Sequence, residues 1–251
     1  MSQLRRAAAA LLLAVAPAWA AAQVLTVSAA ASLAEALREI GSRFEQTRPG
    51  TTLRFNFAAS GVLVQQIVNG APVDVFASAD AETMDRGAQQ KVIDATTRTD
   101  FAANTLVMVT PAAGGPALAA LGELSGTAVK RIAIGKPASV PAGRYALQSL
   151  TAAGLWPALE ARTVYADNVR QVLDYVARGE VEAGFVYRTD ALLARDKVRI
   201  ALTAVGHAAV TYPVAVVADS RQPALARAFV AYLVAPEAQA ILARFGFARP
   251  R

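Results

Sequence analysis

Apolar and polar positions along this chain switch repeatedly between the spacing of a strand and that of a helix. Residues 24–29 are β-prone and mostly apolar, which predicts a buried strand. After Ser32 the apolar residues recur about every 3.6 positions, at Leu33, Ala36, Leu37, Ile40 and Phe44. Pro49-Gly50 then ends the helical pattern. The chain therefore opens with a strand followed by a helix.

This order recurs to the end of the sequence. Further strands are predicted over residues 53–57, 73–77, 105–109, 131–134, 164–165, 184–187, 198–202 and 212–217, with helical patterns between most of them and after Pro223 and Pro236. Asp80 and Asp167-Asn168 are expected to cap helices, and Pro141 fits the first turn of another. Strands that alternate with helices predict mainly parallel sheets covered on both faces, the α/β class. We expect two α/β lobes, one formed by residues 23–102 plus 216–251 and the other by 103–215. The chain would cross between them near residues 103–109 and 212–217, and these crossings would form a hinge.

The N-terminal segment has the pattern of a secretory signal peptide. Arg5 and Arg6 precede an apolar run over residues 7–16, and small residues follow it. Cleavage after Ala20 or Ala22 is expected, so residues 1–22 are interpreted as the signal peptide and the mature protein is placed in the periplasm. No other apolar run approaches the roughly 20 residues that a membrane-spanning helix needs, so the mature chain is not expected to span a membrane.

Composition and charge exclude several classes of function. The net charge of +6 is spread along the chain without a block of like charges, so we expect no nucleic-acid partner. The absence of cysteine leaves no thiolate nucleophile and no thiolate metal site. The single histidine, His207, would have to be the base of any Ser-His-Asp hydrolase, yet no serine has a Gly-x-Ser-x-Gly context. An exported hydrolase is thus a minor alternative, and the protein is expected not to be an enzyme.

Small or hydroxylated residues stand at several junctions between a strand and the next helix. These junctions carry Ser32, Ser60, Ala142 with Gly143, and Asn168 with Val169, while Tyr187 ends another strand. Ligands of open parallel sheets gather at such strand ends, where helix N-termini offer free N–H groups to anions. Taken singly, each polar residue is also explained as a helix cap or a core side chain. Ser32 in particular has the capping-box spacing with Glu35.

The order and spacing of several short motifs resemble the periplasmic molybdate-binding proteins of ATP-driven oxyanion importers, a group of type II periplasmic binding proteins. The resemblance runs from Val24 to about Phe247. Its motifs are Ala29-Ala30-Ala31-Ser32-Leu33, Phe57-Ala58-Ala59-Ser60, Gly70-Ala71-Pro72-Val73-Asp74, Ser78-Ala79-Asp80, Val140-Pro141-Ala142-Gly143, Asp167-Asn168-Val169-Arg170, Gly184-Phe185-Val186-Tyr187 and Tyr212-Pro213-Val214-Ala215-Val216-Val217. It implies a two-lobed type II fold with the ligand cleft between the lobes. One departure is the stretch Ala59-Ser60-Gly61, where relatives often carry further serines.

The resemblance also implies the ligand contacts. It assigns the oxyanion to the hydroxyls of Ser32, Ser60 and Tyr187 and to backbone N–H groups that include those of Ser60, Ala142 and Val169. These five residues would contact the oxygens of molybdate or tungstate and would not bind the metal atom directly. No cofactor is implied. The implied partner is the membrane permease of an ABC-type importer, and a monomer is expected.

The residue types agree with this assignment for a physical reason. Neutral N–H and O–H donors, together with helix dipoles, replace the water shell of a dianion without a buried counter-ion. A protonated oxyanion such as hydrogen phosphate also needs an acceptor, and none of the five positions is a carboxylate. The residues therefore favour molybdate, tungstate or sulfate, and the choice of molybdate rests on the resemblance. Sulfate on the same fold is the main alternative. An iron(III) carrier is disfavoured because clustered tyrosines are lacking around Tyr187. The sensing domain of a regulator is disfavoured because the chain begins with an export signal.

Overall fold

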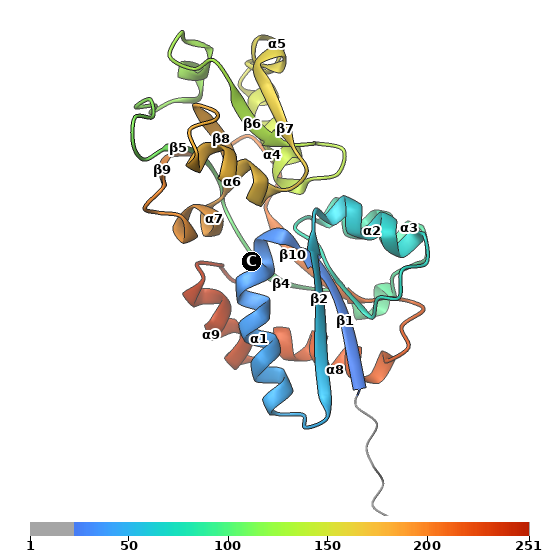
Figure 1. Cartoon of the computed structure of the whole chain (residues 1–251). Coiled ribbons are helices and arrows are strands. Elements are labelled where there is room, and N and C mark those ends of the chain that lie inside the picture. Colours follow the sequence, from blue (N-terminus) through green and yellow to red (C-terminus); the bar gives the residue numbers. More distant parts are fainter. Residues whose placement is uncertain (1–22, 251) are drawn as a thin grey trace, which may run out of the picture.

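The computed structural model describes residues 23–250, which form two α/β lobes, each built on a five-stranded sheet (Figure 1). The predicted signal peptide, residues 1–22, lies outside the described residues. The strands are β1 (Gln23–Ala30), β2 (Thr51–Ala58), β3 (Val75–Ala77), β4 (Thr99–Ala103), β5 (Leu106–Pro111), β6 (Ile132–Gly135), β7 (Thr163–Ala166), β8 (Ala183–Tyr187), β9 (Val198–Thr203) and β10 (Thr211–Val216). The α-helices are α1 (Ala34–Gln46), α2 (Ser60–Val68), α3 (Ala81–Gln89), α4 (Pro141–Ala152), α5 (Trp156–Leu159), α6 (Val169–Ala177), α7 (Arg188–Leu193), α8 (Pro223–Leu233) and α9 (Pro236–Arg244).

The first lobe contains the sheet β2-β1-β3-β10-β4, in which β1 pairs in parallel with β2 and β3, and β10 is antiparallel to β3 and β4. Alternate residues of its strands face opposite helical layers, as a strand period of two requires. Phe76 of β3 packs with α2 and α3, for example against Leu63 and Met84, whereas Val75 belongs to the core shared with α1 and α8. Both faces of this sheet are therefore covered.

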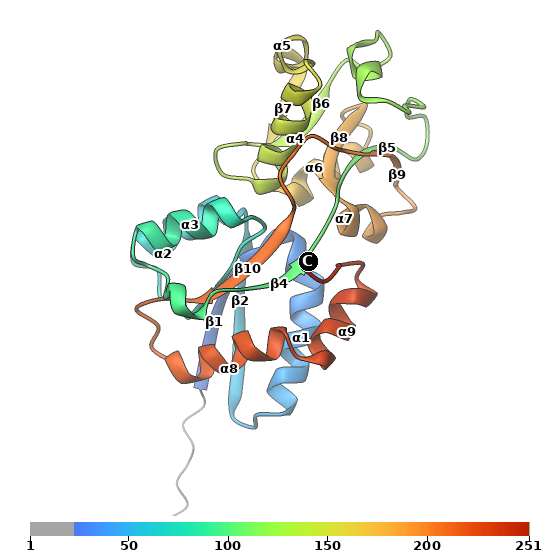
Figure 2. The same ribbon diagram turned by 180° about the vertical axis from the view of Figure 1, so that it is seen from behind.

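The second lobe contains the sheet β7-β6-β8-β5-β9. Strands β7, β6 and β8 are parallel, and β5 is antiparallel to β8 and β9. Helices α4 and α6 cover the two faces, as the front and back views show (Figures 1 and 2). Pro141 begins α4 as predicted, and the Asn168 side chain caps α6 by accepting from the N–H groups of Arg170 and Gln171.

Two chain segments connect the lobes. The first joins β4 to β5 at Asn104 and Thr105, and the second covers residues 204–210 between β9 and β10. The sequence interpretation placed the second crossing at 212–217 and the end of the second lobe at residue 215. Strand β10 instead hydrogen-bonds to β3 and β4, so residues 211–216 belong to the first sheet. Strand β10 directly follows the crossing, so the sequence pattern did not separate the crossing from the strand. The pairing of β10 with β3 and β4 makes the distinction.

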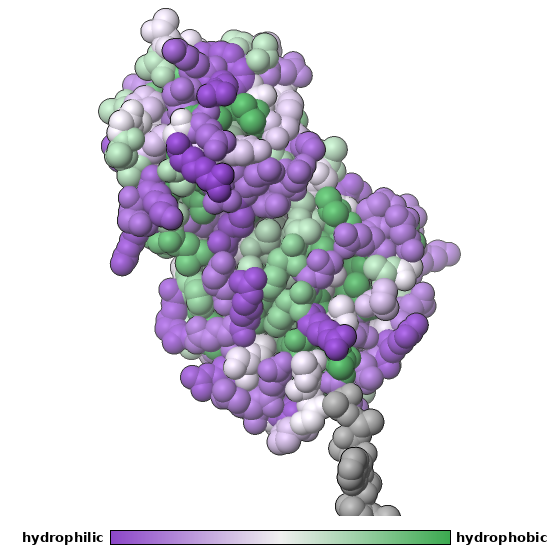
Figure 3. Space-filling model, viewed as in Figure 1, coloured by the Kyte–Doolittle hydropathy of each residue, from purple (hydrophilic) through white to green (hydrophobic). Residues whose placement is uncertain are grey.

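The outer surface of the face in Figure 3 is mostly hydrophilic, and hydrophobic residues gather over the middle of the first lobe and toward the junction with the second. Within residues 23–250, no single helix is both long and apolar enough to cross a membrane. Only the bent pair α8 and α9, which meet at 59°, meets the length and composition criteria together.

Candidate functional site

The five residues singled out from the sequence line one small cavity between the two lobes. Ser32, Ser60, Ala142, Val169 and Tyr187 share it with Ala30, Ala31, Ala58, Ala59, Ala79, Val140, Pro141 and Asn168. The cavity volume is ≈ 10 Å³, which is room for about one water molecule. Every lining side chain is uncharged. The tertiary structure therefore brings together positions that are up to 155 residues apart in the sequence, while their role as ligand contacts remains a prediction.

Ser32 does not cap helix α1. It lies in a 3₁₀ turn, Ala31–Leu33, and α1 begins only at Ala34, with no side-chain cap. The Ser32 hydroxyl instead lies 3.1 Å from the hydroxyl of Tyr212. Glu35, the other half of the predicted capping box, turns away to an ion pair with Arg170. The capping-box prediction is wrong because both side chains contact partners that are distant in the sequence instead.

Ser60 begins helix α2 and is fully buried. Its Oγ accepts a hydrogen bond of 3.0 Å from the backbone N–H of Ala79. The hydroxyl of Tyr187, in the other lobe, donates to the carbonyl of the same Ala79 over a long 3.4 Å. Burial raises the pKa of Tyr187 well above its ordinary value, so this side chain stays a protonated donor.

Three backbone N–H groups complete the donor set. Ser60, Ala142 and Val169 stand in the first turns of α2, α4 and α6, where a helix offers its own N–H groups no acceptor. No hydrogen bond among the described residues uses these three groups. The start of α4 is seated directly on β6, since a Cβ at Gly143 would lie 1.8 Å from the carbonyl oxygen of Gly135. Hydroxyls and helix N-termini therefore converge on one point, an arrangement that suits an anion.

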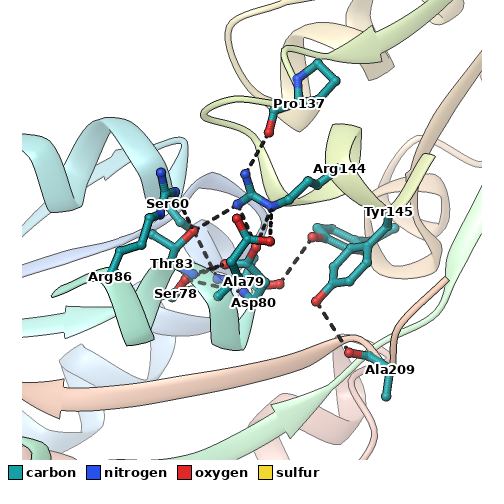
Figure 4. A network of polar contacts seen from close by, with 12 residues as sticks. Ser60, Ser78, Ala79, Asp80, Thr83, Arg86, Pro137, Arg144, Tyr145 and Ala209 are labelled. Carbon is teal, nitrogen blue, oxygen red and sulfur yellow. Dashed lines mark hydrogen bonds and ion pairs between the residues drawn. The ribbon is translucent and has the colours of Figure 1, made fainter. Parts of the chain in front are cut away.

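Two arginines flank the cavity without lining it, and each forms an ion pair with a carboxylate. Arg144 of α4 donates from Nη2 to Asp80 at 2.7 Å and to the Thr83 hydroxyl at 3.0 Å, both in the first lobe (Figure 4). Arg170 of α6 pairs with Glu35 of the first lobe at 2.6 Å. Two ion pairs thus join the lobes, and no free cation faces the cavity from these two positions.

Arg170 also forms an ion pair of 2.7 Å with Asp190 of its own lobe. Asp190 is fully buried, and its other oxygen accepts from the N–H of Tyr187 at 3.1 Å. Burial raises the pKa of Asp190 to about 6, and the nearby guanidinium of Arg170 opposes that rise. This carboxylate therefore holds the end of β8, from which Tyr187 reaches the cavity.

Sequence reasoning missed three residues of the site. Ala79 donates its N–H to Ser60, and its carbonyl accepts from Tyr187. Tyr212 contacts Ser32 directly, and Asn104 contacts Ser32 through Tyr212. Ala79 and Tyr212 lie in motifs that carried the family resemblance, which was the available signal. Asn104 carried none, because a polar residue between two strands is typical of any loop.

A larger hollow of ≈ 440 Å³ lies at the opposite end of the first lobe, beside Val24 and Thr26 at the start of β1. Its buried carboxylate, Asp74, already accepts from the N–H groups of Thr26 and Arg221 and from the hydroxyl of Ser220. None of the five predicted residues lines this hollow. Over residues 23–250, no three His, Cys, Asp or Glu side chains come together in a group fit for a metal ion.

Comparison with known proteins agrees with this geometry. A family model described as bacterial extracellular solute-binding protein matches residues 25–248. The molybdate-binding protein ModA of Escherichia coli is 38% identical over 228 residues, covering 89% of this chain and 88% of that protein. ModA of Haemophilus influenzae is 34% identical over 233 residues, covering 91% of each.

Among solved structures, the periplasmic molybdate-binding protein of Azotobacter vinelandii matches with a TM-score of 0.80 at 27% identity, covering 90% of this chain and 100% of that one. The expected two-lobed type II periplasmic-binding-protein fold is thereby confirmed. The matching family model is named for solute binding, and these relatives are named for molybdate binding. This chain belongs to the family of bacterial extracellular solute-binding proteins, together with the ModA molybdate-binding proteins.

Proposed function

We propose that this protein captures molybdate or tungstate outside the cytoplasm and delivers it to the membrane permease of an ABC-type importer. The observation that carries the proposal is the uncharged, donor-lined cavity between the lobes. Ser32, Ser60 and Tyr187 supply hydroxyls there, and Ser60, Ala142 and Val169 supply first-turn N–H groups. The names of the relatives, which bind molybdate, support the choice of anion.

The donor set favours a fully ionised anion over one that still carries a proton. The Ser60 oxygen already accepts a hydrogen bond within the protein, and the lining contains no carboxylate to receive a proton from a ligand. Hydrogen phosphate would leave its own O–H unpaired in a buried site, which costs about 1–3 kcal/mol. Sulfate is a dianion like molybdate and remains the second candidate.

Binding is proposed to close the two lobes by a hinge motion at the two crossings, with the ion pairs of Arg144 and Arg170 formed in the closed state. No chemical change of the anion and no cofactor is involved. The protein is proposed to work as a periplasmic monomer after removal of residues 1–22. For the lobes we propose bounds close to those from the sequence, with the second crossing at residues 204–210.

Calorimetric titration of the ligand-free protein with sodium molybdate, tungstate, sulfate and phosphate tests the proposal. Saturating molybdate should also raise the stability of the protein by RT ln(1 + [L]/Kd), about 2.7 kcal/mol at a hundredfold excess over Kd. We expect binding of molybdate and tungstate, weaker binding of sulfate, and binding of phosphate that is weaker still but measurable. Sulfate binding without molybdate binding would overturn the anion assignment and leave the architecture intact.

A further inference from the structure

A chain of hydrogen bonds leads from the first crossing between the lobes to the Ser32 hydroxyl. It begins at Asn104, whose side-chain Oδ1 accepts from the N–H of Thr105 at 2.9 Å. A backbone N–H is always a donor, so this contact fixes which end of the amide is the oxygen. The Nδ2 group must then donate, and it faces the hydroxyls of Thr189 at 2.9 Å and Tyr212 at 3.2 Å.

Tyr212 is the next member of the chain and is fully buried. Its oxygen accepts from Asn104, and its other partner among the described residues is Ser32 Oγ at 3.1 Å. The Tyr212 proton therefore points to Ser32. Burial raises the pKa of Tyr212 far above its ordinary value, so the phenol remains a donor throughout the neutral and mildly alkaline range.

Ser32 thus receives a hydrogen bond and keeps its own proton. Among residues 23–250 no acceptor for that proton is found, and Ser32 lines the cavity. Ser60 stands in the same condition, since its oxygen accepts from the N–H of Ala79. Each of the two serine oxygens therefore accepts one hydrogen bond from the protein, and its proton is free for a ligand.

We propose that Asn104 and Tyr212 are positioning residues that set the direction of the Ser32 hydroxyl, so that the site presents a donor to the anion and is a poorer acceptor for anions that carry a proton. The proposal deepens the proposed function and rests on it. A serine hydroxyl by itself rotates freely between donating and accepting. With the relay Asn104–Tyr212–Ser32 in place, one lone pair of Ser32 Oγ is occupied, and its proton points away from Tyr212 and toward the anion. Tyr212 and Ser32 both belong to the first lobe, so their contact does not depend on closure.

A double-mutant cycle between Tyr212→Phe and Ser32→Ala tests the relay, read by calorimetric titration with sodium molybdate. Tyr212→Phe keeps the ring and removes only the hydroxyl. We expect it to weaken molybdate binding about tenfold. In the Ser32→Ala background the same change should alter the affinity by less than about twofold, because the relay acts only through Ser32. An equal loss in both backgrounds, or no loss in Tyr212→Phe alone, would overturn the relay.

Selectivity gives a second readout that a purely structural defect would not produce. Tyr212→Phe frees Ser32 to accept, so the ratio of molybdate affinity to hydrogen phosphate affinity, measured on the same preparation, should fall. A partly unfolded variant would lower both affinities equally and leave the ratio unchanged, which would count against the proposal. Tyr232→Phe, in α8 and not lining the cavity, is the matched control and should keep both affinities.

Asn104→Asp keeps the acceptor for Thr105 and removes the donor to Tyr212, so the relay should reverse. We expect a larger loss of molybdate affinity than in Tyr212→Phe, and a much smaller effect of Asn104→Asp once Tyr212→Phe is present. An effect of the same size in both backgrounds would mean simple charge repulsion and would overturn the reversal. Should the wild type bind sulfate and not molybdate, the proposed function fails, and the same cycle run with sodium sulfate judges the relay separately.

Discussion

Arg144 of the second lobe and Asp80 of the first form an ion pair across the cleft, with Nη2 and Oδ2 2.7 Å apart. The Arg144 side chain is 13% exposed and that of Asp80 is 4% exposed. Asp80 also caps helix α3 by accepting from the N–H of Thr83, as the sequence predicted. Because Arg144 lies two residues after Ala142, the helix start that is proposed to bind the anion also carries the residue that joins the lobes.

Arg144→Met should therefore weaken molybdate binding strongly. The closed form would hold the Asp80 carboxylate buried without its cation, at a cost of about 3 kcal/mol or more, which is about a hundredfold in affinity. The stability of the ligand-free protein should fall less, since the open form hydrates Asp80. Calorimetric titration measures the first effect and urea unfolding the second. Arg178→Met, at a 70% exposed arginine, is the control. A loss below threefold would show that this pair does not hold the lobes together.

Glu35→Gln should have a much smaller effect, although the Glu35–Arg170 pair is equally short at 2.6 Å. The two side chains are 37% and 23% exposed, and exposed pairs contribute only about 0.2–1 kcal/mol. Arg170 also keeps its contact with Asp190. We expect molybdate affinity to fall no more than about fivefold, and less at high salt because salt screens the pair. A loss of more than tenfold at high salt would show that the exposure of this ion pair does not limit its contribution to binding.

Ser32→Ala and Ser60→Ala should each weaken molybdate binding by about 1.5–3 kcal/mol, the contribution of a hydrogen bond to a charged group. Each substitution removes one hydroxyl that lines the cavity and leaves the backbone donors in place. Calorimetric titration gives the two affinities. Ser125→Ala, at an exposed serine, should bind as the wild type does. Wild-type affinity in both cavity variants would mean that these serines serve only the packing of the first lobe.

Gly143→Ala should damage both stability and binding. The added Cβ would meet the carbonyl oxygen of Gly135 at 1.8 Å, so the start of α4 must move away from β6. Overpacking of this kind costs about 1–3 kcal/mol of unfolding free energy, and the displaced N–H of Ala142 would no longer aim at the anion. Urea unfolding and titration with molybdate measure the two effects. Gly122→Ala, where nothing lies within 4 Å of the added Cβ, should change neither.

Stability should depend on pH through Asp190. Burial raises its pKa in the folded protein to about 6, against an ordinary value of 3.8. The folded state therefore binds a proton more tightly than the unfolded state, and the stability gained from this proton is present below about pH 4 and lost as pH rises through 6. The unfolding free energy of the wild type minus that of Asp190→Asn should fall over this interval. A difference that grows with pH would mean that the charge of Arg170 outweighs burial.

Local features of the fold were predicted well because near neighbours determine them. All strands except β4, which the pattern did not predict, lie where they were expected. The Asp80 and Asn168 caps and Pro141 at the start of α4 are confirmed. The capping box of Ser32 and Glu35 was a local prediction as well, and it was wrong. Arg170, 135 residues from Glu35, and Tyr212, 180 residues from Ser32, took the two side chains that the box required.

By itself the sequence determined the α/β class, the small and hydroxylated residues at the strand ends, and a donor set without carboxylates. Only the tertiary structure decided that Ser32, Ser60, Ala142, Val169 and Tyr187 line one cavity, that β10 belongs to the first sheet, and that Asn104 directs Tyr212 toward Ser32. The physical reason is the distance along the sequence over which each kind of interaction acts. Periodicity and caps reflect interactions over a few residues, whereas the direction of a buried hydroxyl depends on donors that chain folding brings from more than 100 positions away.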